Sequence, residues 1–79
     1  MDSKEVEIKS KAVTEKLQSL AGPNNNVLVQ LLFAFDIVRQ IENGEEKLGN
    51  FNKPSYDKSV KLLSGVGFYP IPPEYNYKK

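Results

Sequence analysis

Residues 27–41 read VLVQLLFAFDIVRQI, and this stretch decides the fold. Its apolar pattern continues for about 17 residues, which is long for a strand and ordinary for a helix. Asn24, Asn25 or Asn26 can cap the start of this helix, and Gly44 suits the left-handed position after its end near Asn43. Wrapped at about 100° per residue, the helix carries one broad apolar arc. The arc consists of Val27, Leu28, Leu31, Ala34, Phe35, Val38 and Ile41, with Ile37 at its edge.

The opposite side of this helix differs between its two halves. In the C-terminal half it is polar and consists of Asp36, Arg39, Gln40 and Asn43, so this half could sit at the surface of a monomer. We expect Asp36 to face water and pair with Arg39 or Gln40, rather than to act as a polar specificity device across an interface. In the N-terminal half the same side carries Val29, Leu32 and Phe33. Either the rest of the chain or another chain must cover these three side chains.

Two further helices are predicted on either side of the central one. The first runs from about Ser3 to Leu20, can be capped by Asp2 with Glu5, and stops at Gly22-Pro23. The second is short, is expected to start at a Ser55 cap, and ends at Gly65 or Gly67. Their apolar stripes are Val6, Val13, Leu17 and Leu20 in the first and Tyr56, Val60 and Leu63 in the second. Ile8, Leu62 and Val66 lie off these stripes, and this surplus favours association.

The C-terminal residues cannot continue as a helix, because prolines occupy positions 70, 72 and 73. They favour an extended polyproline II conformation, with mobile residues at the end. Pro70 to Pro73 fits the pattern PxxP, and Pro72-Pro73-Glu74-Tyr75 fits PPxY, which resembles the ligand motif of WW domains. We favour the alternative of a structural strap, packed on the helices through Tyr69, Ile71 and Tyr75. The predicted fold is therefore an all-α domain of three helices over residues 1–69, followed by an extended tail over residues 70–79.

The composition restricts the chemistry of the protein. Its 79 residues include no Cys and no His, so a disulfide framework and a structural zinc site are excluded. A chain this short has a small core, and association is the remaining way to reinforce it. Without Cys or His the usual nucleophile and general base are missing, so we expect no enzyme activity, cofactor, metal or small-molecule substrate. The charged start Met1–Glu5 has no apolar stretch behind it, and we expect a cytoplasmic protein.

The functional hypothesis is a non-enzymatic protein-interaction module that acts as a homodimer or in a partner complex. Its contact residues would be Val29, Leu32 and Phe33, with Ile8 and Leu62 beside them. Such a module could be an adaptor, an inhibitor or a small regulator of the kind that phages and mobile elements encode.

Two alternatives remain open. A dimer could bind nucleic acid by joining weak basic patches, but the net charge is only +1 and the helix that would have to read base edges is the most apolar segment. These patches are Lys4, Lys9, Lys11 and Lys16 in the first helix and Lys58, Lys61, Lys78 and Lys79 near the C-terminus. The Lys-rich first helix and the segment from Asp57 to Leu63 resemble the layout of small helical bacteriocin immunity proteins. Those proteins generally have four helices and this chain has room for three, so we do not assign it to that family.

Overall fold

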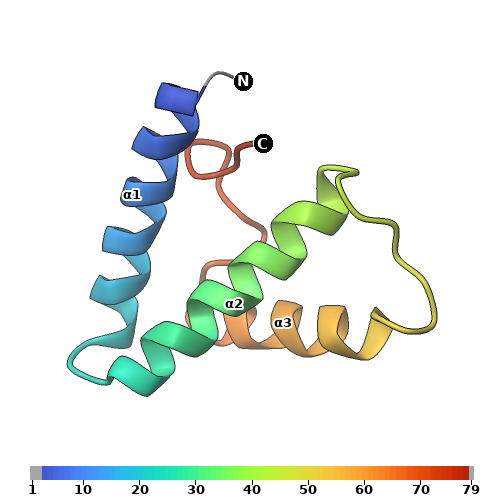
Figure 1. The fold of residues 1–79 in the computed structure, drawn as a ribbon. Coiled ribbons are helices and arrows are strands. Elements are labelled where there is room, and N and C mark those ends of the chain that lie inside the picture. The colour runs from blue at the N-terminus through green and yellow to red at the C-terminus, as the bar shows by residue number, and fades with distance from the viewer. Residues whose placement is uncertain (1–2, 79) are drawn as a thin grey trace.

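The computed structural model describes residues 3–78, which form three helices and no strand. The helices are α1 (Ser3–Ala21), α2 (Asn25–Glu42) and α3 (Lys53–Gly65). Figure 1 shows α1 and α3 on opposite sides of α2, with the C-terminal segment returning to end beside α1. The all-α prediction with two longer helices and one short helix is confirmed.

The signals that start and stop the first two helices agree with the sequence. Asn24 caps α2, since its side-chain oxygen accepts a hydrogen bond of 3.2 Å from the backbone N–H of Val27. Gly22 follows α1 with φ of 65°, and Gly44 follows α2 with φ of 76°. Both angles lie in the left-handed region that glycine adopts without steric cost. The cap predicted at Asp2 lies outside the described residues.

The start of α3 differs from the prediction. The helix begins at Lys53 instead of after Ser55, with Asn52 in the capping position. The Asn52 side chain organises the preceding loop, because it accepts from the N–H of Gly49 at 2.8 Å and donates to the carbonyl of Lys47 at 3.0 Å. Pro54 lies in the first turn of α3, where a helix does not need the missing N–H. The proline therefore belongs to the helix, whereas the sequence predicts that it precedes a Ser55 cap.

The core lies where α2 passes between its two neighbours. It combines apolar residues from all three helices with two aromatic residues that follow α3. Its buried members are Val13, Leu17, Leu31, Ala34, Phe35, Val38, Leu63, Phe68 and Tyr77. Among the described residues, α2 makes packing contacts with both α1 and α3, whereas α1 and α3 make none with each other. The second helix thus packs against both outer helices, which do not contact each other directly among the described residues.

The tail is a packed strap rather than a mobile, fully extended end. Residues 73–75 form a turn, in which the N–H groups of Tyr75 and Asn76 bond to the carbonyls of Pro72 and Pro73 at 3.0 and 3.2 Å. Tyr77 is buried against the core, so the prediction that the last residues are mobile is wrong at this position. The physical reason is that the turn redirects the chain onto α2, which the proline pattern alone does not indicate. Tyr69, Ile71 and Tyr75 are partly buried against the same core.

Candidate interaction surface

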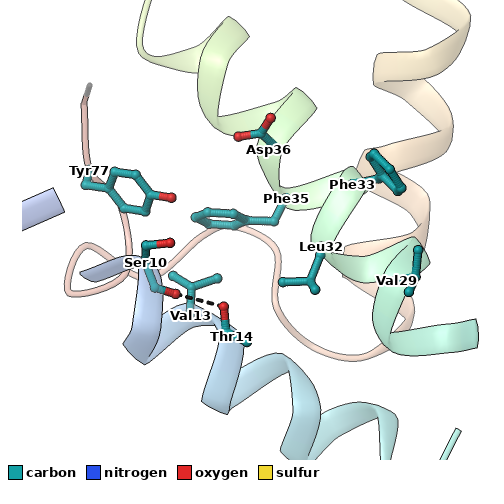
Figure 2. A pocket seen from close by; sticks show the side chains of 9 residues that line it. All are labelled: Ser10, Val13, Thr14, Val29, Leu32, Phe33, Phe35, Asp36 and Tyr77. Carbon is teal, nitrogen blue, oxygen red and sulfur yellow. Dashed lines mark hydrogen bonds between the residues drawn. The ribbon is translucent and has the colours of Figure 1, made fainter. Parts of the chain in front are cut away.

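The candidate surface centres on Phe33, which is 68% exposed in the middle of α2. Phe33 borders an apolar groove of about 350 Å³ between α2 and α1, which we call the α1-side groove. Figure 2 shows Leu32 and Phe35 pointing from α2 toward α1, with Phe33 on the other side of the helix. The groove is lined by Ser10, Val13, Thr14, Val29, Leu32, Phe33, Phe35, Asp36 and Tyr77.

Phe33 also borders a second groove, on the opposite flank of α2. This α3-side groove has a volume of about 450 Å³ and lies between α2 and α3. It is lined by Gln30, Phe33, Ala34, Ile37, Ser55, Lys58, Ser59 and Leu62. The exposed part of α2 is therefore a ridge with Phe33 at its centre and an open groove on each side.

The ridge stays open because of how the helices are arranged. Since α1 and α3 each pack on α2 without contacting each other, they leave between them one strip of α2 that neither helix covers. Val29 and Phe33 follow each other at a spacing of four residues along this strip, and both are exposed. The strap does not reach the strip, because it packs beside Phe35 and Arg39. Within the described chain, nothing covers Phe33.

The predicted contact residues occupy different positions relative to this ridge. Val29, Leu32 and Phe33 all line the α1-side groove, and Leu32 is the one of the three that is partly buried. Leu62 lines the α3-side groove. Ile8 is exposed on α1 but borders neither groove. The structure thus brings four of the five predicted residues to one face.

The polar half of α2 is more buried than its sequence predicts. Arg39 was placed on a polar face at the surface, but its side chain has no exposed area. Its guanidinium donates to Asp36 at 2.8 Å, to Glu45 at 2.6 Å and to the carbonyl of Tyr77 at 3.4 Å. It also lies 4.8 Å from the centre of the Tyr77 ring, as in a cation–π contact. The strap covers this face because the face offers it a charged and hydrogen-bonding partner.

Two neighbours of Arg39 complete this anchor. Asn43 donates to the carbonyl of Tyr77 at 2.8 Å and to the side-chain oxygen of Asn76 at 3.0 Å. Asp36 accepts from both Arg39 and Gln40, as expected, while its side chain remains 46% exposed. Asp36 therefore connects the buried anchor to the edge of the α1-side groove.

A second polar cluster fixes α3 and the residue before the strap to the end of α2. The hydroxyls of Tyr56 and Tyr69 both donate to the same carboxylate oxygen of Glu42, at 2.9 and 2.7 Å. Burial raises the pKa of Tyr56 above its usual value of 10.0, and the neighbouring Tyr69 hydroxyl and the hydrogen bond to Glu42 raise it further. The hydrogen bond to Glu42 raises the pKa of Tyr69, although the neighbouring Tyr56 hydroxyl opposes this effect. Both phenols are held in the neutral form that can donate.

Two exposed apolar residues, which no sequence pattern singles out, lie in the loop between α2 and α3. Phe51 is 99% exposed, and Leu48 is also exposed. Phe51 lies within, and Leu48 directly before, a run of Gly, Asn and Pro that indicates a turn but does not show which way a side chain points. They line neither groove. Phe51 is therefore a useful reference for an exposed Phe outside the ridge.

The PPxY segment is engaged within the chain. The centres of the Tyr75 and Phe68 rings lie 5.4 Å apart, and Pro72 is partly buried. A WW domain would have to remove Tyr75 from this contact in order to bind it.

Comparison with protein-family models, with curated proteins and with solved structures finds no match for this chain. Among residues 3–78, no helix has the length and hydropathy needed to cross a bilayer. No group of three potential metal-binding side chains occurs in the same range.

Proposed function

We propose that this protein is a non-enzymatic protein-interaction module that self-associates through the exposed ridge of α2. The observation that carries this proposal is the position of Phe33, which is 68% exposed between two open apolar grooves. Burying a Phe side chain contributes about 1.5–3 kcal/mol, so an interface that covered Phe33 would gain a free energy of this order. Aromatic side chains of this kind are typical anchors of protein interfaces.

A second copy of the chain is the occupant that this shape fits best. An exposed apolar helix face with an aromatic residue at its centre can be buried against an identical face. A two-fold dimer uses the same patch twice, so the Phe33 ridge of each copy can pack against that of the other. The small core, in a chain without Cys or His, gives such association a stabilising role.

An adaptor, an inhibitor or a small regulator could all use a dimer of this form. In each of these roles, dimer formation or partner recognition would depend on the ridge around Phe33. Val29 and Ile37 extend that face along α2, and Leu62 borders it from α3.

The direct test is the molar mass of the full chain as a function of concentration, measured by multi-angle light scattering. We expect the mass to rise from 8.9 kDa toward twice that value between low and high micromolar concentration. A mass of 8.9 kDa at every concentration would contradict self-association. If Phe33→Asp then abolished capture of a different protein, that protein would be the occupant of the ridge.

A further inference from the structure

The two grooves beside Phe33 differ in charge. Asp36 is the single charged residue that lines the α1-side groove, and Lys58 is the single charged residue that lines the α3-side groove. The face is therefore apolar along its centre, negative on one flank and positive on the other. This polarity restricts how two copies can meet.

Both charges are free to make a further contact. Each oxygen of Asp36 accepts one hydrogen bond within the chain, from Arg39 or from Gln40, and a carboxylate oxygen can accept more than one. The side chain of Asp36 is also nearly half exposed. On α3, Lys53 pairs with Asp57 at 3.3 Å, whereas Lys58 has no carboxylate within ion-pair distance among the described residues.

Only two families of two-fold arrangement bring this face onto itself with the α2 helices side by side. If the axis runs across α2, the helices are antiparallel and each groove meets its own copy. Asp36 would then face Asp36, and Lys58 would face Lys58. If the axis runs along α2, the helices are parallel, and the α1-side groove of each copy meets the α3-side groove of the other.

We propose that two copies dimerise with parallel α2 helices, so that Asp36 of each copy faces Lys58 of the other across the Phe33 ridges. This inference rests on the proposed self-association and specifies its geometry. Opposite charges then meet twice, whereas the antiparallel dimer brings like charges together twice. Charge complementarity at the rim of an interface selects orientation and register more than it adds affinity.

The charge pattern can be tested with Lys58→Glu. In the parallel dimer this change replaces two attractions with two repulsions, and we expect the dissociation constant to rise by roughly tenfold at low salt. Lys61→Glu is the matched control, since Lys61 lies on the same helix but does not line the groove. In an antiparallel dimer Lys58→Glu exchanges one like-charge pair for another, so an unchanged dissociation constant would overturn the proposal.

The orientation can be tested independently, because the chain has no Cys. Ser10 lines the α1-side groove and Ser55 the α3-side groove, so Ser10→Cys and Ser55→Cys add thiols without altering charge. One variant is labelled with ¹⁵N, the two are mixed, and a short bismaleimide links thiols across the dimer. Mass spectrometry then distinguishes mixed from like pairs.

We expect mixed Ser10→Cys to Ser55→Cys links to dominate. Links between identical variants, with no mixed product, would contradict the parallel arrangement. If those like pairs formed in a dimer that Phe33→Asp dissociates, self-association would stand and only the orientation would fail. If no dimer formed by light scattering, the proposed function itself would fail.

Discussion

Phe33 and Phe35 lie two residues apart on α2 and point to opposite sides of it, one 68% exposed and the other 3% exposed. The centre of the Phe35 ring lies 6.0 Å from the centres of the Phe68 and Tyr77 rings. Two positions on a helix differ by about 200° in direction, so one of the pair reaches the core and the other cannot. Phe35 therefore contributes to the folded core, whereas Phe33 is available for the proposed association.

This difference predicts that the same substitution has a large effect on stability at one position and a small effect at the other. Phe35→Ala should lower the free energy of unfolding by about 3–5 kcal/mol, because it leaves a cavity between Phe68 and Tyr77. Phe33→Ala should change it by less than about 0.5 kcal/mol in dilute solution, where the monomer dominates. Urea denaturation followed by circular dichroism measures both values. A large loss for Phe33→Ala in the monomer would mean that Phe33 belongs to the core.

The buried guanidinium predicts that Arg39 is essential for the fold. Arg39→Ala removes the partner of Asp36 and Glu45 and the donor to the carbonyl of Tyr77. Because Asp36 and Glu45 remain 46% and 17% exposed, the loss comes mainly from the buried packing of Arg39 and its hydrogen bond to the strap, and we expect the free energy of unfolding to fall by about 2–5 kcal/mol. The control is Lys53→Ala, which removes an exposed pair with Asp57 and should cost no more than about 1 kcal/mol. Equal effects on thermal unfolding would show that the anchor is not formed in solution.

The strap predicts that Tyr77 stabilises the helices. Tyr77→Ala removes a buried ring and should lower the free energy of unfolding by about 3 kcal/mol. Lys78→Ala, an exposed neighbour, is the control and should have little effect. Deleting residues 70–79 should destabilise the chain further, as measured by thermal unfolding. A truncated chain of unchanged stability that had lost a binding partner would instead assign the segment to recognition.

The tyrosine cluster predicts a loss of stability at alkaline pH. Burial raises the pKa of Tyr56, and hydrogen bonding to Glu42 raises that of Tyr69, so the folded chain keeps protons that the unfolded chain loses near pH 10.0. The stabilisation is fully present below this pH and declines as the pH rises above it. Absorbance at the phenolate band should show Tyr56 and Tyr69 ionising later than in the unfolded chain.

Glu42→Gln removes the carboxylate that favours the neutral phenols, so it should bring the pKa of Tyr69 closer to its ordinary value. Glu46→Gln, on the adjacent loop, is the control. If both variants titrate like the unmodified chain, the two hydrogen bonds to Glu42 are not formed in solution.

The three helices could be predicted because their signals are local. The 3.6-residue period of α2 and the Asn24 cap act within one or two turns, and both agree with the structure. The start of α3 was misplaced because Pro54 is compatible with either side of a helix boundary. The hydrogen bonds that decide the boundary come from Asn52 to a loop that has no periodic pattern.

The burial of Arg39 could not be predicted, because it depends on a segment 38 residues further along the chain. A polar residue on the polar side of a helix normally faces water, and the sequence holds no sign that the strap would fold onto it. Whether Phe33 is exposed could not be predicted for the same reason. Its exposure depends on where α1, α3 and the strap lie, which no pattern within α2 determines.

The central claim is that the Phe33 ridge is the contact between copies of this chain. The most direct measurement compares Phe33→Asp with Phe51→Asp by sedimentation equilibrium, since both replace an exposed Phe with the same charge. We predict that Phe33→Asp sediments as a folded monomer of 8.9 kDa at concentrations where the unmodified chain and Phe51→Asp are dimers. A dimer of unchanged affinity for Phe33→Asp would contradict the claim, as would dissociation by both substitutions alike.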